Sequence, residues 1–357
     1  MQLVRLLLFP ISLIYGLVVM LRNMAYDCNV FKTHRFKVPV ILVGNLAVGG
    51  TGKSPMIAYL VGKLKPSFNI AVLSRGYGRS TKGFICATTD ATSEQIGDEP
   101  LQLKSKFPDL TVAVCENRVQ GISRLIDKHS LILMDDGYQH RAVTPGLSIL
   151  LFDYTSLFKS QWLLPTGNLR EPLSGRKRAD IIIVTKTPEN ITQAQRQQSI
   201  ARIKPYPHQQ LFFSYLEYGS LQALNAQGMP ARALDSINQS THIILLTGIA
   251  NAVPLLKKLN EYSTHIHHHQ YPDHYAYQED DITKLVNVYH GLPVNDRIVI
   301  TTEKDMQRLK NTELKKHLNN LSIYYIPVQM VMHQPDQQIF DGMIEKFAGS
   351  YQLRNDI

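Results

Sequence analysis

One segment near the start of the chain limits its fold more than any other. The sequence "VGNLAVGGTGKSPMIAYL", residues 43–60, has the form of a phosphate-binding loop between a buried strand and a helix. Its glycines let successive backbone N–H groups turn inward onto phosphate oxygens, and the N-terminus of the following helix faces the same anion. The segment therefore predicts a parallel α/β sheet with an anion site at its edge.

The loop departs from the standard pattern G-x-x-x-x-G-K-[ST] at one position, where Ala47 replaces the first glycine. We expect a different backbone path early in the loop to make that glycine unnecessary. The other requirements are met, because Lys53 can reach the terminal phosphates and the Ser54 hydroxyl can bind Mg²⁺. The predicted phosphate-binding residues are Gly49, Gly50, Thr51, Gly52, Lys53 and Ser54.

Short apolar runs alternate with helical patterns along the chain, which indicates buried parallel strands covered by helices. In the first part these runs are residues 38–43, 69–74, 110–115, 131–136, 147–153 and 179–186. Around residues 205–230 the pattern becomes alternating and hairpin-like, as in a β-ribbon linker. Further apolar runs follow at residues 242–251, 297–305 and 321–328.

A chain of 357 residues is long enough for two domains. We predict an α/β fold with a P-loop NTPase-like parallel sheet domain, an N-terminal membrane-associated helix and a second, smaller α/β domain. The expected divisions are an anchor helix at 1–27, a nucleotide-binding domain at 28–210, a β linker at 211–232 and a C-terminal α/β domain at 233–357.

The N-terminus is unusually apolar for a soluble enzyme. Leu6 to Leu21 form an apolar run of sixteen residues, flanked by Arg5 and Arg22. The run is shorter than the roughly 20 residues of a spanning helix, and no A-x-A-like cleavage site follows it. A membrane-surface anchor is favoured, with a buried helix and a true span as alternatives. The net charge of +9 suits acidic partners such as phosphates, nucleic acid or an anionic membrane face, and charge alone does not choose among them.

Four charged residues lie where phosphate chemistry needs them. Asp135 and Asp136 end an apolar strand, a position from which a carboxylate binds Mg²⁺ beside a phosphate loop. The alternative is a simple strand-end turn. Arg170 and Glu171 lie on the Pro/Gly-rich loop 164–172, where Arg can neutralise a transferring phosphoryl group and Glu can support the metal. A solvated turn is the alternative there.

Two further positions carry side chains that can exchange protons. Asp98 lies at the start of a predicted helix, where a helix cap is the simplest interpretation. His274 lies on a turn, from which an imidazole can point into a cleft. His265, His267 and His269 alternate along a predicted strand. Since no second ligand cluster accompanies them, exposed histidines are favoured over a metal site.

Taken together and in order, these segments resemble one known family, the tetraacyldisaccharide 4'-kinases (lipid A 4'-kinases) of Gram-negative bacteria. The resemblance rests on the apolar N-terminus, "VGNLAVGGTGKSP", "LSRGYGR", "GDEP", "DDGYQHR", "LPTGNLREP", "LTGIAN", "YPDHY" and "TTEKD". The family's loop is of this modified type. Two small departures are Asn168, where Pro is expected, and Tyr138, where Phe is common.

The resemblance implies an ATP-dependent kinase that phosphorylates the 4'-hydroxyl of tetraacyldisaccharide 1-phosphate to give lipid IVA. It implies ATP and Mg²⁺ as cofactors, a lipid disaccharide as substrate, and a peripheral or monotopic place at the cytoplasmic face of the bacterial inner membrane. Neither a nucleic-acid partner nor an obligate protein partner is expected.

The resemblance also implies roles for individual residues. Asp98 matches the family's catalytic base and His274 the partner that works with it. The implied catalytic residues are Asp98, His274, Lys53 and Arg170, and the implied metal-side residues are Ser54, Asp135, Asp136 and Glu171.

The alternative function is a membrane-associated P-loop ATPase or GTPase switch. ATPase switches with a deviant loop carry a Lys before the paired glycines, and Val48 stands there. GTPases recognise guanine through T-K-x-D, and in "VTKTPEN" Pro188 replaces the Asp. Both observations count against the alternative.

Overall fold

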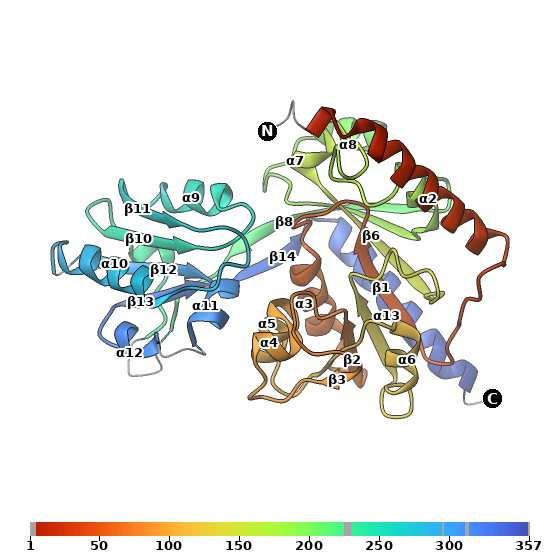
Figure 1. Cartoon of the computed structure of the whole chain (residues 1–357), viewed down its shortest axis with the longest axis horizontal. Helices are drawn as coiled ribbons and strands as arrows, with labels where there is room; N and C mark the ends of the chain where they lie inside the picture. The colour runs from red at the N-terminus through yellow and green to blue at the C-terminus, as the bar shows by residue number, and fades with distance from the viewer. Residues whose placement is uncertain (1–4, 225–229, 295, 311–313, 356–357) are drawn as a thin grey trace. The chain divides into compact units, whose positions relative to one another are not determined.

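The computed structural model describes residues 5–224, 230–294, 296–310 and 314–355 of the chain. The chain forms two compact units (Figure 1). Unit 1 comprises residues 1–89, 103–216 and 330–357, and unit 2 comprises residues 90–102 and 217–329. The chain therefore passes between the units repeatedly rather than once.

Unit 1 is built on a nine-stranded sheet in the order β14-β8-β7-β6-β1-β5-β2-β4-β3. Its strands are β1 (Val40–Asn45), β2 (Ile70–Ser74), β3 (Ile85–Cys86), β4 (Thr111–Val114), β5 (Leu131–Asp135), β6 (Leu147–Asp153), β7 (Ile181–Thr185), β8 (Gln210–Tyr218) and β14 (Val328–Met332). Every neighbouring pair from β8 to β4 is parallel, and the edge strand β3 pairs antiparallel with β4. The predicted parallel sheet is confirmed.

Helices cover this sheet because its central strands are buried on both faces. The helices are α2 (Phe9–Asp27), α3 (Lys53–Leu64), α6 (Arg118–Ser123), α7 (Tyr154–Leu157), η1 (Leu173–Arg178), α8 (Gln193–Ile203) and α13 (Asp336–Asn355). In α3 the apolar residues that recur at helical spacing, Met56 through Leu64, form its buried face. In α13 the fully buried Phe340 packs against Tyr59 and Phe212.

Unit 2 contains a five-stranded sheet in the order β11-β10-β12-β13-β9. Its strands are β9 (Gln222–Ala223), β10 (His242–Thr247), β11 (His265–Gln270), β12 (Arg297–Thr302) and β13 (Ile323–Ile326). Its helices are α4 (Ser93–Ile96), η2 (Leu234–Ser236), α9 (Val253–Leu259), α10 (Glu279–His290), α11 (Glu303–Lys310) and α12 (Lys315–Leu318), and α5 (Asp98–Lys106) begins in this unit. Separate apolar clusters pack on the two faces of the sheet.

Two details differ from the sequence-based expectation. β8 is not an arm of a hairpin, because it pairs parallel to β7 inside the nine-stranded sheet. The chain folds back only later, at an isolated antiparallel bridge between Leu221 and Arg232, and residues 225–229 of the expected linker lie outside the described residues. Residues 90–102, expected within the nucleotide-binding domain, group with unit 2.

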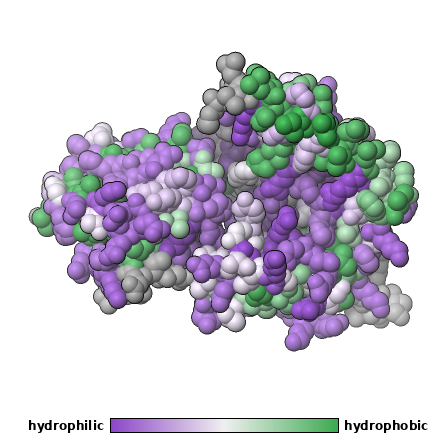
Figure 2. All heavy atoms as spheres, in the orientation of Figure 1, coloured by the Kyte–Doolittle hydropathy of each residue, from purple (hydrophilic) through white to green (hydrophobic). Residues whose placement is uncertain are grey.

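Helix α2 has an unusual distribution of side chains. The residues it buries are Ser12 and Gly16, whereas Leu13 and Leu17 are 59% and 58% exposed. Figure 2 shows the resulting apolar surface along the helix. In the described part of the chain, α2 is the helix whose length and composition would allow it to cross a membrane. The exposed leucines count against the buried-helix alternative for this segment.

Candidate functional site

The phosphate-binding loop connects β1 to α3 at the carboxyl edge of the nine-stranded sheet. Gly49 and Gly52 have φ values of +106° and +88°, which residues with a Cβ rarely adopt. Gly52 is the N-cap of α3, so the helix begins at Lys53 and directs its first N–H groups at the loop. This is the geometry that anion binding requires.

Ala47 occupies the place of the missing glycine without strain. It forms an antiparallel bridge with Leu169, and the neighbouring Val48 N–H donates to the Asn168 carbonyl at 2.7 Å. The first part of the loop is thus paired like a strand, a conformation that any residue adopts. The expected alternative backbone path is present.

Side chains from neighbouring strand ends hold the loop backbone. Thr185 Oγ1 donates to the Thr51 carbonyl at 2.8 Å, and Asn45 Nδ2 donates to Thr51 Oγ1 at 2.8 Å. Lys186 Nζ donates to the Gly50 carbonyl. These contacts engage carbonyl and hydroxyl oxygens rather than the N–H groups on which phosphate binding depends. Lys186 is the lysine of "VTKTPEN", a segment whose sequence indicated no role in the phosphate-binding loop.

The structure brings Lys53, Asp136 and Arg170 together. Asp136 Oδ1 lies 3.7 Å from Lys53 Nζ and 2.9 Å from Arg170 Nη1. Burial alone would raise the pKa of Asp136, but the charges of Lys53 and Arg170 outweigh it and lower that pKa. Asp136 therefore remains an anion that joins the loop lysine to Arg170.

Asp135 and Glu171 have different surroundings. Asp135 is the last residue of β5, in register with Val43 on β1, and is 5% exposed. The Glu171 carboxylate accepts hydrogen bonds from Arg178 Nη2 at 2.9 Å to both oxygens and from Gln139 at 3.0 Å. The structure thus places Glu171, expected on the metal side, in a buried ion pair.

A buried arginine that no sequence motif indicates lies near the two aspartates. Arg118 is 2% exposed and donates to the Cys115 carbonyl at 2.9 Å. Burial lowers its pKa to about 10, against the opposing charges of Asp135 and Asp136. Burial and the charge of Arg118 also lower the pKa of His140 to about 4, so His140 is neutral at physiological pH.

A second cluster, in unit 2, contains Asp98 and His274. Asp98 Oδ2 lies 2.8 Å from His274 Nδ1 and accepts hydrogen bonds from Arg308 Nη2 at 2.7 Å and Arg308 Nε at 3.1 Å. Burial alone would raise the pKa of Asp98, but hydrogen bonds from His274 and Arg308 lower it to about 2. Asp98 thus does more than cap a helix.

Other residues of unit 2 orient this pair. Lys304 Nζ lies 3.1 Å from His274 Nε2. Since an ammonium can only donate, Nε2 accepts and Nδ1 carries the proton that His274 donates to Asp98. Arg308 is held in turn by Asp305 at 2.9 Å and by the Gly248 carbonyl at 3.0 Å. No sequence motif indicates a role for Arg308, although its partners Gly248 and Asp305 lie in "LTGIAN" and "TTEKD".

The oxygen donors beside the phosphate-binding loop suit Mg²⁺. Within the described residues, no group of three or more His, Cys, Asp or Glu side chains is placed to hold a metal. Mg²⁺ does not need such a group, because it is usually bound through one or two carboxylates, substrate phosphates and water. The Ser54 hydroxyl at the start of α3 and the Asp135 carboxylate at the end of β5 supply donors of this kind.

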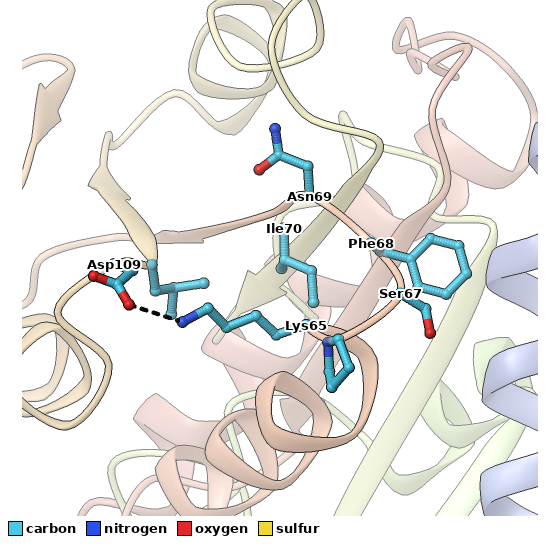
Figure 3. Close-up of a pocket in the computed structure, with 8 residues that line it drawn as sticks. Lys65, Ser67, Phe68, Asn69, Ile70 and Asp109 are labelled. Carbon is cyan, nitrogen blue, oxygen red and sulfur yellow. Dashed lines mark ion pairs between the residues drawn. The ribbon is translucent and has the colours of Figure 1, made fainter.

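Two other features lie apart from this chemistry. A hollow of about 380 Å³ in unit 1 is lined by residues 65–70, Asp109 and Leu110 (Figure 3). It lies where β2 begins, at the edge of the parallel sheet opposite the phosphate-binding loop.

On edge strand β11, the His265 ring stacks on that of His242 with 4.7 Å between the ring centres, which fits the expected row of histidines.

Comparison with known proteins places the chain in a family. The model of the family described as "Tetraacyldisaccharide-1-P 4'-kinase" (LpxK) matches residues 4–347. The chain belongs to this family. The resemblance inferred from the sequence motifs is thus confirmed.

Several relatives and one solved structure are similar to this chain over nearly its whole length. The tetraacyldisaccharide 4'-kinase of Phocaeicola vulgatus is 41% identical, covering 96% of this chain and 94% of the relative. The tetraacyldisaccharide 4'-kinase of Bacteroides thetaiotaomicron is 40% identical, covering 94% of this chain and 91% of the relative. The crystal structure of LpxK from Aquifex aeolicus, described as an "apo" form in complex with ATP, is 27% identical with a TM-score of 0.73, covering 96% of this chain and 99% of that one.

The contact from Thr185 to the loop can be tested by removing one hydroxyl. Thr185→Val should raise the Kd for ATP roughly five- to tenfold, because a lost hydrogen bond costs on the order of 1 kcal/mol. Titration calorimetry measures this. Thr187→Val is the matched control, since Thr187 Oγ1 bonds to the Ser214 carbonyl and His333 instead of the loop. An equal rise in the Kd for ATP in both variants would contradict a specific role for Thr185.

Proposed function

We propose that this chain is an ATP-dependent kinase that transfers phosphate to the 4'-hydroxyl of tetraacyldisaccharide 1-phosphate, giving lipid IVA in lipid A biosynthesis. The observation that carries the proposal is family membership over nearly the full chain, together with a phosphate-binding loop whose Lys53 lies beside Asp136. The relatives bear the name of this activity, and the solved neighbour is described in complex with ATP.

On the phosphate side, the residues of unit 1 provide charge and orientation. We assign to Lys53 and Arg170 the stabilisation of negative charge on the transferring phosphoryl group, a task that dominates this chemistry. Asp136 contacts both cations and sets their positions. Held by Ser54 and Asp135, Mg²⁺ would supply further neutralisation of the β- and γ-phosphates.

On the acceptor side, we assign proton removal to the Asp98–His274 pair. A sugar hydroxyl is a poor nucleophile at neutral pH, so a base must take its proton as the bond to phosphorus forms. With a pKa of about 2, Asp98 is a weak base while Arg308 holds it. Acceptance of the proton by Asp98 therefore requires the Arg308 contact to loosen when the lipid binds, while His274 keeps the carboxylate oriented.

We also propose that the chain works at the cytoplasmic face of the inner membrane as a peripheral or monotopic protein. The exposed leucines of α2 support this, as does Trp162, which is 49% exposed and packs edge-on against Phe9 at 5.6 Å. Tryptophan is common at membrane interfaces. The net charge of +9 favours anionic headgroups, and ATP is a cytoplasmic substrate.

The product assay tests the proposed function directly. Wild-type chain, ATP labelled at the γ-phosphate and tetraacyldisaccharide 1-phosphate should give a bis-phosphorylated lipid on thin-layer chromatography. Lys53→Ala should lower turnover at least about 10²- to 10³-fold, because it removes a charge that stabilises the transition state. Lys63→Ala is the matched control on the same helix, since Lys63 pairs with Asp341 at 3.0 Å. Near-normal turnover by Lys53→Ala would remove the loop from the mechanism.

The low pKa of Asp98 leads to a prediction about pH. In the free enzyme Asp98 is ionised at every pH well above 2, so its own titration cannot shape kcat/KM at neutral pH. Asp98→Asn should therefore lower kcat/KM by about 10²- to 10⁴-fold, by the same factor from pH 5 to pH 9. A factor that shrinks toward pH 5 would show that Asp98 titrates there and would contradict the Arg308 ion pair. His274→Ala should lower kcat/KM by a smaller factor than Asp98→Asn does. The double variant should lower kcat/KM by less than the product of the two single factors, because the two residues act as a unit.

Membrane contact by α2 can be separated from catalysis. Changing Leu13 and Leu17 together to Gln should weaken partition into anionic phospholipid vesicles at least about tenfold, because each buried Leu contributes about 1.5–3 kcal/mol. Sedimentation with the vesicles measures this. Ile339→Gln is the control, since Ile339 lies on α13 and is 53% exposed. Unchanged sedimentation of the double variant would exclude this face as the membrane contact.

A further inference from the structure

Ser12, Tyr15 and Gly16 of α2 contact one segment of unit 1, residues 163–171, which we call the docking loop. Ser12 Oγ lies 2.7 Å from Thr166 Oγ1 and accepts a hydrogen bond from the Thr166 N–H at 3.0 Å. Both residues are buried, with exposures of 4% and 8%. One turn along, the Tyr15 hydroxyl donates to the Arg170 carbonyl at 2.7 Å. The helix is thus joined to the docking loop by specific polar contacts.

The packing between these hydrogen bonds is close. A Cβ at Gly16 would lie 2.7 Å from Leu163 Cδ1, so glycine lets the helix approach the loop. Ser12 and Gly16 are four residues apart and share one face of the helix. Because the large apolar residues of α2 point outward, the small and polar side fixes where the helix sits.

The other side of the docking loop contacts the phosphate-binding loop. The Arg170 N–H donates to the Leu46 carbonyl at 2.7 Å, beside the Ala47–Leu169 bridge described above. The Arg170 side chain then reaches Asp136, which also contacts Lys53. The docking loop therefore lies between α2 and the phosphate-binding loop.

We propose that Ser12 and Tyr15 are positioning residues for phosphoryl transfer. By holding Thr166 and the backbone of Arg170, they keep the docking loop in the place that sets the Arg170 side chain and the start of the phosphate-binding loop. Helix α2 is thus part of the support of the active site as well as a membrane contact. The inference rests on the proposed function, because it assumes that Arg170 acts on the transferring phosphoryl group.

The test uses the full-length chain with lipid substrate in mixed micelles. Ser12→Ala and Tyr15→Phe should each lower kcat roughly 5- to 50-fold, since small misplacements of reacting groups are costly. The KM for ATP and vesicle partition should stay near wild type, and the melting temperature should fall by only a few degrees, because one lost hydrogen bond costs on the order of 1 kcal/mol. Ser12→Thr, which keeps the hydroxyl, should restore most of kcat. Tyr26→Phe, a hydroxyl removed elsewhere on α2, should leave kcat unchanged.

A double-mutant cycle with Arg170→Ala tests the route of the effect. If Ser12 acts through Arg170, Ser12→Ala should change the turnover of the Arg170→Ala enzyme by less than about twofold. The inference would be overturned if Ser12→Ala lowered kcat by the same factor in the Arg170→Ala enzyme as in the wild type. It would also be overturned if the variants lost kcat only in proportion to a loss of vesicle partition. Normal turnover by both Ser12→Ala and Tyr15→Phe would overturn it while leaving the proposed function intact. Absence of product with the wild-type chain would overturn the proposed function itself.

Discussion

A loop that points its backbone N–H groups at an anion must find partners elsewhere for its carbonyl oxygens, because unpaired backbone groups are costly when buried. Much of unit 1 follows from this requirement. The end of β7 supplies Thr185 and Lys186 to the carbonyls of the phosphate-binding loop. The docking loop pairs with its first residues in the manner of a strand. The sheet and the docking loop thus share the task of holding one short segment.

Each unit also contains a carboxylate that is kept ionised by neighbouring cations. Asp136 lies beside Lys53 and Arg170, and Asp98 beside Arg308. Burial opposes the charge in both cases, so the cations have to outweigh a desolvation cost. Asp136 and His274 also have positive φ values of 47° and 61°. Such strain persists where surrounding contacts fix the backbone, and it is common at functional sites.

The sequence was sufficient for features that depend on local patterns. Apolar runs predicted the strands of the parallel sheet, and glycine spacing predicted the loop that ends at Lys53. Local patterns do not reveal contacts between residues that are far apart in the sequence. Examples are the contact between Asp98 and Arg308, which are 210 residues apart, and that between Thr185 and Thr51, which are 134 residues apart. Arginine and threonine are too common to signal these roles. One departure from the family pattern is explained by the structure, because the Tyr138 hydroxyl donates to a buried carbonyl at 2.9 Å.

The division of the chain between the units also sets an order for its synthesis. Strand β14 and helix α13, with the core residue Phe340, follow the whole of unit 2 in the chain, so unit 1 cannot complete its sheet until unit 2 has been translated. Helix α2 leaves the ribosome early, yet Leu163, which it packs against, is made 151 residues after Ser12. During that interval the docking loop, against which Ser12 and Gly16 pack, has not yet been made. With the membrane location proposed above, a lipid surface is an environment in which the apolar side of α2 can be sheltered while the rest of the chain is made.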